Sequence, residues 1–472
     1  MTAEDTSPDA LSPDFIDSLR EIVGPANLKL ADAMSAIDYG VAAANLGAAA
    51  VILPADTEQV AMVVRCANRH SVSIVTHGGR TGLVGGGFST PGQLIVSTTR
   101  LNKLQHFSEI DRVAVVGAGM TLQNLQERAL RSGLEPGIDL PSRGSATIGG
   151  MVSTNAGGIS AFRYGVMRHR VLGIEAVLPD GSIYSDLTQV IKNAAGYDLK
   201  QLFIGAEGTL GIVTAVAIKL EPLPAATATV LFGLPSIDAA LFATRLGLAP
   251  QSGYLTAAEA LWHSYFTLTS SEQSWKVRDY DSDHPVNLLL SLGGPDELLL
   301  QSALGQIYEA LCDRFPDISA VVASSQAQQS QLWRLREDTD AIYRRHPAAP
   351  SFDVSVPLSA IDDYTERCLS EFRSLDPGLA PYIFGHLADG NLHIVLNASA
   401  AEFSADKIAA VETILYRDLS RIGGSFSAEH GIGAKRVGAL RTTANPVKLT
   451  LMKTIKASLD RGSVFNPGKV LG

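Results

Sequence analysis

The sequence predicts an α+β protein built from two main domains, and three observations support this prediction. The first half contains three glycine-rich segments separated by short apolar runs that are typical of strands. After Glu221-Pro222-Leu223-Pro224 these clusters stop, and strand and helix patterns alternate. The 472 residues also exceed what one ordinary core accommodates. We therefore expect a first domain over residues 1–224, which begins with a helical segment over 1–44, a second domain over 225–424, and a C-terminal segment over 425–472 that returns to the first domain.

Composition and charge exclude several classes of protein. The formal net charge of −10 disfavours a nucleic-acid partner, which requires a basic surface. The three cysteines are too few and too far apart for a disulfide framework, so we expect a reducing, cytoplasmic location. Met1–Pro8 lacks the basic and apolar regions of a secretory signal. The most apolar window, Val41–Pro54, is shorter than the about 20 residues that span a bilayer, so no integral membrane segment is expected.

Local patterns define the elements of the first domain in order. Residues 12–35 have a loosely helical pattern, and residues 48–53 have the pattern of a buried strand. Asp56, with Gln59 three residues later, resembles a capping box, and the apolar spacing that follows is that of an amphipathic helix. Further strands are expected over 72–75, 94–97 and 113–116, and a helix capped by Thr121 is expected to run to Arg131.

The first glycine-rich segment, residues 78–87, directly follows one of these strands. Glycine lets backbone N–H groups approach an anion closely, so the expected guest is a diphosphate. The segment matches neither a Walker loop nor the G-x-G-x-x-G fingerprint, so binding of ATP or of a nicotinamide is not supported. The alternative is a flexible loop without a ligand, although Arg80 and Thr81 interrupt the glycines where a linker has serines. Two further glycine-rich segments, over 141–165 and 193–214, indicate a long ligand.

The second domain alternates strands and helices without repeats or low-complexity tracts. This pattern is typical of an antiparallel sheet covered by helices. Strands are expected over 227–233, 286–292 and 352–356, and helices over 236–247, 295–315, 359–373 and 404–422, with a last helix near 446–460 in the C-terminal segment.

The stretch from Phe384 to Val395 places two histidines symmetrically about Asp389-Gly390. Asp-Gly between apolar runs predicts a hairpin with a two-residue turn, in which His386 pairs directly with His393. Residues paired in this way have Cβ atoms about 4.5–5.5 Å apart, close enough for two imidazoles to share a divalent ion. The alternative, two hairpin histidines without an ion, stays open on this segment alone.

Taken together, these segments resemble the FAD-dependent D-2-hydroxyacid dehydrogenases of the vanillyl-alcohol oxidase/PCMH flavoprotein superfamily. The group includes D-2-hydroxyglutarate dehydrogenase, D-lactate dehydrogenase and the flavin subunit of glycolate oxidase. The resemblance runs from about residue 45 to the end of the chain, and it implies a PCMH-type FAD-binding domain and a substrate-binding cap domain. It rests on the combination of Gly78–Gly87, Ile148–Gly158, Gly196–Val213, His386–His393, Glu429-His430-Gly431 and Asn466-Pro467.

The resemblance implies noncovalent FAD, because Thr81 stands where relatives that tether the cofactor carry a histidine. His77, just before the loop, is expected to be structural. The residues implied for the diphosphate are Gly78, Gly79, Arg80, Thr81, Gly82 and Gly85, with Gly86 beside them; those for the flavin are Pro141, Gly149, Gly150, Asn155 and Gly158; those for the adenosine and ribose are Glu207, Ile212 and Val213; Asn466 is a further cofactor contact.

The resemblance also implies a divalent metal, expected to be Zn²⁺, with His386, His393 and Glu429 as ligands. His430 is implied as the general base and as a substrate contact, because imidazole has an ordinary pKa of about 6.5. In this scheme the substrate's carboxylate and 2-hydroxyl chelate the ion, His430 removes the hydroxyl proton, and hydride passes from C2 to flavin N5.

Further substrate contacts are implied for Arg336 and Asn193, whereas the neighbouring Arg334 is expected to be solvated. Two positions depart from the hydroxyglutarate enzymes, which typically carry Lys two residues before an Asp and Asn two residues after the second metal histidine. This chain has Ser351 and Val395 there, which resembles the D-lactate branch. The loops at 80–87 and 145–158 look nearer the hydroxyglutarate branch, so the side chain of the substrate stays open.

The expected reaction is oxidation of a D-2-hydroxyacid to the 2-oxoacid. Two alternatives stay open: a non-catalytic flavin-binding subunit of a larger oxidase, and catalysis without a metal. The expected electron acceptor is a quinone, an electron-transfer flavoprotein or a similar carrier, because no fingerprint for NAD is present. If the chain associates with itself, a homodimer is expected, since dimers are the commonest soluble oligomers.

Overall fold

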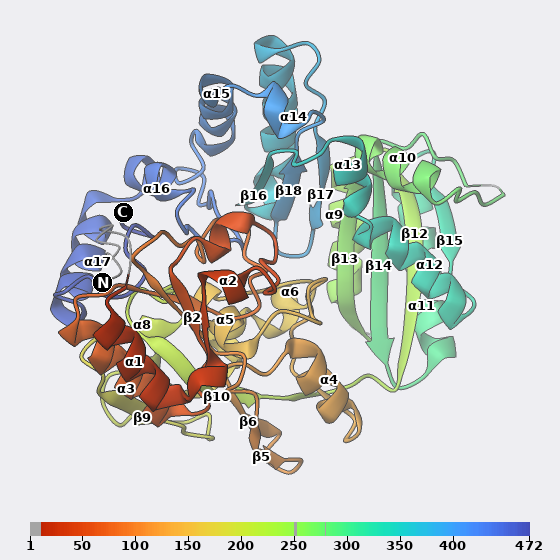
Figure 1. Ribbon diagram of the computed structural model, residues 1–472. Coiled ribbons are helices and arrows are strands. Elements are labelled where there is room, and N and C mark those ends of the chain that lie inside the picture. The colour runs from red at the N-terminus through yellow and green to blue at the C-terminus, as the bar shows by residue number, and fades with distance from the viewer. Residues whose placement is uncertain (1–10, 250–252, 279) are drawn as a thin grey trace. The chain divides into compact units, whose positions relative to one another are not determined.

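The structure is a computed structural model that describes residues 11–249, 253–278 and 280–472 (Figure 1). The chain folds into two compact units. The first unit runs to Gly158, resumes over Tyr164–Leu223 and includes Glu429–Gly472, and the second comprises Ile159–Arg163 and Pro224–Ala428. Met1–Pro8, in which we found no secretory signal, lies outside the described residues. Within the described ranges, no helix is long and apolar enough to cross a membrane.

The first unit contains a four-stranded sheet in the order β1-β2-β4-β3, a five-stranded antiparallel sheet in the order β5-β6-β10-β8-β9, and the pair β11-β7. Strands β2 and β3 both run parallel to β4 in the first of these sheets. The strands are β1 (Leu28–Leu30), β2 (Ala50–Ile52), β3 (Ile74–His77), β4 (Leu94–Ser97), β5 (Leu104–Ser108), β6 (Val113–Gly117), β7 (Leu134–Glu135), β8 (Val171–Val177), β9 (Ile183–Asp186), β10 (Ile212–Lys219) and β11 (Glu221–Pro222).

Helices cover these sheets and bury their apolar faces. α1 and α3 pack on the four-stranded sheet, and α4 and α5 pack on the five-stranded sheet. Each valine that α3 buries contributes about 1.5–3 kcal/mol. The helices are α1 (Pro13–Val23), α2 (Ala31–Met34), α3 (Thr57–Arg69), α4 (Leu122–Leu130), α5 (Ile148–Thr154), α7 (Met167–Arg170), α8 (Lys200–Phe203), α16 (Val437–Thr443) and α17 (Pro446–Leu459), while α6 (Ala161–Tyr164) joins the two units and η1 (Pro25–Asn27) and η2 (Ala43–Leu46) are 3-10 turns.

The predicted starts of two helices are confirmed by their caps. Asp56 accepts a hydrogen bond from the backbone N–H of Gln59, and Thr121 accepts one from Asn124. The prediction of a helical segment over residues 12–35 is partly wrong, because α1 ends at Gly24, whose φ is +79°. The chain after it includes strand β1, which pairs with β2, and strand β5 was not predicted.

The second unit is one seven-stranded antiparallel sheet in the order β15-β12-β14-β13-β17-β18-β16, which confirms the predicted antiparallel sheet. Figure 1 draws its strands in colours from green (β12) to blue (β18). The strands are β12 (Ala226–Leu234), β13 (Tyr254–Trp262), β14 (Val286–Gly294), β15 (Ser319–Val322), β16 (Ser351–Ser355), β17 (Tyr382–His386) and β18 (Asn391–Val395).

Helices cover both faces of this sheet. α10, α12 and α13 share an apolar cluster with Leu231, Leu261 and Leu289. α9 approaches Leu290, which points to the opposite face from its neighbour Leu289. The helices are α9 (Ile237–Leu248), α10 (His263–Glu272), α11 (Glu297–Arg314), α12 (Gln326–Glu337), α13 (Asp340–Arg345), α14 (Ile361–Leu375) and α15 (Ala405–Tyr416), with 3-10 turns η3 (Leu358–Ala360) and η4 (Ala400–Glu402).

Strands β13 and β15 of this unit were not predicted, and the end of one predicted helix needs correction. Strand β13 lies between β14 and β17. The helix expected over 404–422 ends at Tyr416 as α15. Side chains of α14 cap its last carbonyls, because Arg367 Nη1 donates to the carbonyl of Ile414 at 3.0 Å and Tyr364 Oη donates to that of Leu415 at 2.8 Å. Those carbonyls therefore have partners although the helix stops there.

Candidate functional site

The glycine-rich segments of the first unit pack directly against one another. A Cβ atom added to Gly79 would lie 1.9 Å from the carbonyl oxygen of Ser145, and one on Gly78 would lie 2.3 Å from Thr147 Oγ1. Only glycine permits so close an approach of the loop at 78–87 to the start of α5. Two of the predicted cofactor segments therefore form one surface.

The segment that follows Glu429 packs against the glycine loop and forms a third part of this surface. The backbone N–H groups of Ala434 and Lys435 both donate to the carbonyl of Val84 at 3.0 Å. Lys435 Nζ donates to the carbonyl of Leu83 at 2.8 Å. Residues more than 300 positions apart in sequence thus hold the glycine loop in place.

Glu207, predicted to contact the adenosine and ribose, makes a different set of contacts. Its two carboxylate oxygens accept hydrogen bonds from the backbone N–H groups of Ile432 and Gly433, each at 2.7 Å. Burial raises the pKa of this carboxyl, although the two N–H groups oppose the shift. Asn466 donates to the Glu207 carbonyl at 2.6 Å and accepts from Thr76 N–H at 3.1 Å. The side chains of Glu207 and Asn466 therefore hydrogen-bond the segments of this surface to one another.

The same surface leaves buried polar atoms without partners among the described residues. Thr76 Oγ1, His77 Nδ1 and Arg80 Nε have no hydrogen bond there. His77 Nε2 lies 2.8 Å from the Gly87 carbonyl oxygen, and burial lowers the pKa of this histidine to about 4, so the neutral ring is held in the loop. No described atom lies within 4 Å of a Cβ added to Gly82. Orphaned polar atoms beside open space fit a polar ligand such as a diphosphate.

The other residues predicted to contact FAD lie in different environments. Gly149 approaches Ala118, where an added Cβ would lie 2.5 Å from the alanine Cβ, while a Cβ on Gly150 would meet Thr147 Oγ1 at 3.1 Å. Asn155 caps α5 with φ +53°. The side chains of Ile212 and Val213 are buried in core clusters, whereas Pro141 is exposed. Gly158 has a positive φ of +100°. In the loop at 78–87, Gly85 has φ +75° and Gly86 lies beside Glu207.

The hairpin that carries the two histidines has a different register from the predicted one. His386 pairs with Asn391 and Phe384 pairs with His393, so the turn has four residues, not two. The N–H of Gly390 donates to the His386 carbonyl at 3.1 Å, and this bond closes a four-residue turn directly after His386. Segments outside the hairpin hold this turn, because the Gly390 carbonyl accepts from the N–H of Val356 at 2.9 Å and the N–H of Leu387 donates to the carbonyl of Ala258 at 2.8 Å. The predicted direct pairing of the histidines is therefore wrong.

The new register still brings the two imidazoles together. Asn391 and His393 are two residues apart on β18, so their side chains point to the same face, and His386 becomes a diagonal neighbour of His393. The ring centroids are 5.4 Å apart, and one ring nitrogen of each lies within 4.8 Å of the other. This separation suits two ligands of one metal ion.

Glu259, which sequence reasoning missed, lies beside this pair on β13. Its Oε1 lies 2.7 Å from His386 Nδ1, and its Oε2 accepts from Arg336 Nε at 2.7 Å. Burial would raise the pKa of the Glu259 carboxyl, but its contacts with His386 and Arg336 hold it below its ordinary value. One signal could have revealed it: it is the single charge in the apolar run 254–262.

Arg336 is buried at the end of α12, in contrast to the exposed Arg334. Its guanidinium carbon lies 4.8 Å from the centroid of the Phe384 ring, and Tyr265 Oη donates to its backbone carbonyl at 2.8 Å. Tyr265 in turn stacks on Phe384 with ring centroids 4.1 Å apart. The guanidinium is therefore fixed near the histidine pair, and its Nε is already engaged.

The chain leading to Glu429 is held beside the same sheet. Ser425 forms an antiparallel bridge with Ser355, and the N–H of Ala428 donates to Asp353 Oδ2 at 3.0 Å. Asp353 is paired with His393 across β16 and β18. Glu429 follows Ala428 directly, and within the first unit its Oε1 accepts from Gly158 N–H at 2.7 Å.

Two predicted substrate contacts lie in loops. His430 is half-buried in the segment after Glu429. Asn193 is exposed, and its Oδ1 accepts a hydrogen bond from the N–H of Ala195 at 3.1 Å, which closes a local turn. No contact of Asn193 with the other predicted site residues is present among the described residues.

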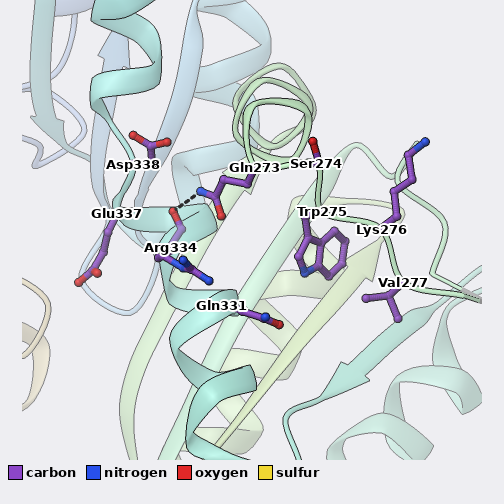
Figure 2. Close-up of a pocket in the computed structure, with 9 residues that line it drawn as sticks. All are labelled: Gln273, Ser274, Trp275, Lys276, Val277, Gln331, Arg334, Glu337 and Asp338. Atoms are coloured by element: carbon purple, nitrogen blue, oxygen red, sulfur yellow. Dashed lines mark hydrogen bonds between the residues drawn. The ribbon is translucent and has the colours of Figure 1, made fainter.

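A separate pocket lies between the C-terminal part of α12 and the segment that follows α10 (Figure 2). Trp275, Gln331 and Arg334 are among the residues that line it, and Gln273 Nε2 donates to the carbonyl of Arg334 at 2.8 Å. None of the residues predicted to bind metal, substrate or cofactor lines this pocket. The candidate site is therefore the histidine pair, not this pocket.

Comparison with known proteins identifies the family. Residues 223–470 match the family described as "FAD linked oxidases, C-terminal domain", and residues 48–186 match the family described as "FAD binding domain". The chain belongs to the FAD-linked oxidases. As a member, it is an FAD-dependent oxidoreductase, which confirms the predicted family, the enzyme class and the use of FAD.

Two relatives of this FAD-linked oxidase are named as 2-hydroxyacid dehydrogenases. It is 36% identical over 428 residues to a D-2-hydroxyglutarate dehydrogenase of Xanthomonas citri pv. viticola, with 89% of each chain covered. It is 32% identical to a putative mitochondrial D-lactate dehydrogenase of Schizosaccharomyces pombe, with 88% of this chain and 80% of that protein covered. Among solved structures, p-cresol methylhydroxylase with substrate bound matches with a TM-score of 0.75 at 17% identity and covers 98% of each chain. This likeness confirms the predicted fold class.

Proposed function

We propose that this FAD-linked oxidase oxidises a D-2-hydroxyacid to the 2-oxoacid, with the hydroxyl deprotonated beside a divalent metal. The observation that carries the proposal is the pair His386 and His393, whose ring nitrogens lie within 4.8 Å of each other on a buried sheet face. The names of the two relatives support a D-2-hydroxyacid as substrate.

The surface formed by the glycine segments is the proposed FAD site. Backbone N–H groups of Gly78–Gly82 and the guanidinium of Arg80 would bind the diphosphate, which supplies the partner that Arg80 Nε lacks among the described residues. Thr81 offers no ring nitrogen for a covalent tether, so the cofactor would be held noncovalently. When bound, FAD accepts the hydride.

His386, His393 and Glu429 are the proposed metal ligands. Two imidazoles and one carboxylate suit Zn²⁺ and leave coordination positions for substrate. The bridge of Ser425 to β16 and the bond of Ala428 to Asp353 support this assignment of Glu429, because they hold the preceding residues beside His393. When bound, the ion lowers the pKa of a coordinated hydroxyl.

His430 and Arg336 are proposed to act on the substrate itself. His430 would remove the hydroxyl proton, since a neutral imidazole accepts a proton near pH 7. Arg336 would bind the substrate carboxylate through its two terminal amino groups, because its Nε already donates to Glu259. The burial of Arg336 strengthens such a charged contact, since water competes for it less.

A small, uncharged substrate side chain is favoured by one specific observation. Ser351 and Val395, the two departures from the hydroxyglutarate pattern, are direct partners across β16 and β18. Neither can form an ion pair with a second carboxylate, and Val395 also lies opposite Tyr382. D-Lactate is therefore the first candidate. D-2-Hydroxyglutarate, for which the relative from Xanthomonas citri pv. viticola is named, is the second.

The test is anaerobic reduction of the bound flavin by a panel of D-2-hydroxyacids and their L enantiomers. We expect loss of the oxidised-flavin absorbance with D acids and none with L acids. If no acid of the panel bleaches the flavin, the proposed reaction is refuted. Reduction only after addition of a copurifying protein would support the alternative of a subunit that depends on a larger oxidase.

A further inference from the structure

The buried carboxylate of Glu259 joins two residues to which the proposed function gives separate tasks. One oxygen contacts His386 Nδ1 at 2.7 Å and the other accepts from Arg336 Nε at 2.7 Å. Glu259 is 1% exposed. We propose that Glu259 is a positioning residue that orients His386 for metal binding and, with its second oxygen, holds Arg336. This inference rests on the proposed function.

The hydrogen-bond chemistry defines which nitrogen of His386 faces the ion. A carboxylate that accepts from a guanidinium has no proton to donate, so His386 Nδ1 is the donor. The proton on Nδ1 leaves the lone pair on Nε2. Glu259 thus keeps His386 in the tautomer that binds a metal through Nε2.

The fold holds this contact in place from several sides. Glu259 and His386 are direct partners across β13 and β17, so the two side chains share one face of the sheet. The His386 ring meets that of His393 edge to face, at an interplanar angle of 84°. Arg336 rests over Phe384 and therefore cannot leave the second oxygen without losing that contact as well. The carboxylate is fixed between two partners.

Such a contact affects metal binding through the basicity and orientation of the ligand. Loss of a carboxylate or carbonyl partner of a metal-bound histidine typically lowers metal affinity about 10- to 100-fold. An ion pair that served stability alone would need only Arg336. If His386 and Arg336 share the carboxylate, a substitution of Arg336 should change how strongly a substitution of Glu259 lowers Zn²⁺ affinity.

Glu259→Gln is the informative variant because one amide cannot accept from both neighbours. Arg336 requires an acceptor, so the amide oxygen would turn to Arg336 and the amide NH₂ to His386 Nδ1. That orientation forces the proton of His386 onto Nε2 and blocks the metal. The Zn²⁺ affinity of the full-length, flavin-loaded chain, measured by competition with a chromophoric chelator, should fall about 10- to 100-fold.

The double variant Glu259→Gln with Arg336→Met tests the reason for the loss. Without Arg336 the amide oxygen is free to accept from His386 Nδ1, so most of the Zn²⁺ affinity should return. Wild-type affinity in Glu259→Gln, or equal weakness in the single and double variants, would overturn the inference. If the single variant does not fold, the double variant decides, and a loss there of about 10- to 100-fold refutes it.

His386→Ala separates this inference from the proposed function. Loss of Zn²⁺ in His386→Ala with wild-type affinity in Glu259→Gln would leave the proposed metal site standing and overturn the role of Glu259. Equal Zn²⁺ binding by the wild-type chain and His386→Ala, or none by the wild-type chain, would overturn both.

Discussion

Gly79→Ala tests how the glycine loop is built. The new Cβ would lie 1.9 Å from the Ser145 carbonyl oxygen and 2.7 Å from its carbon, both backbone atoms that cannot rotate away. Such overpacking costs about 1–3 kcal/mol. A domain of about 200 residues loses about 2–4 °C of Tm for each kcal/mol. We therefore expect calorimetry to show that the FAD-free protein melts about 2–12 °C lower. Fluorescence titration should show that its affinity for FAD falls as well.

Gly82→Ala is the matched control, since no described atom lies within 4 Å of its added Cβ and its φ is not positive. The FAD-free Tm should stay unchanged. A methyl group in the diphosphate cradle would displace a charged hydrogen bond worth about 1.5–3 kcal/mol, so FAD should bind roughly 10- to 100-fold more weakly. An unchanged Tm in Gly79→Ala would refute the described packing, and unchanged FAD affinity in Gly82→Ala would refute the diphosphate cradle.

Three further predictions concern other parts of the chain. As pH falls from 6.5 to about 4, His77 takes up a proton in the unfolded chain but not in the folded chain. The free energy of unfolding should therefore fall by at most about 1.4 kcal/mol per pH unit. Denaturant titrations should show that His77→Gln reduces this slope. Gly305→Ala, in the middle of α11 with no described atom within 4 Å, should stabilise the second unit by about 0.5–1 kcal/mol in the same titrations; a loss of stability would contradict the open surface there. Ser351→Lys should raise the kcat/KM for D-2-hydroxyglutarate relative to D-lactate about tenfold or more, because a charged hydrogen bond contributes about 1.5–3 kcal/mol; an unchanged ratio would place the substrate side chain elsewhere.

Elements with local signals could be predicted from the sequence. The caps at Asp56 and Thr121 and the apolar spacing after them lie within one helix each, so α3 and α4 were expected close to where they occur. The histidine pair was also found, although for a partly wrong reason. The alternation of side chains along a strand kept His386 and His393 on one face even after the register changed.

Features that depend on distant partners could not be predicted. The four-residue hairpin turn is held by bonds from Leu387 to Ala258 and from Val356 to Gly390, and both partners lie outside the hairpin. The contacts of Glu207 with Ile432 and Gly433 join residues more than 220 positions apart. Glu259 lies in a continuous apolar run, and such a run has no periodicity that distinguishes a strand from a helix. The partners of Glu259 also come from two other elements, β17 and α12.

In the proposed reaction, a divalent metal at the histidine pair would assist hydride transfer to FAD. The most direct measurement is the rate of flavin reduction in a single anaerobic turnover with the best D-2-hydroxyacid, before chelation, after chelation and after Zn²⁺ is restored. We predict a large loss of rate on chelation, with the bound flavin retained, and recovery with Zn²⁺. An undiminished rate in the metal-free protein, confirmed by elemental analysis, would contradict the claim.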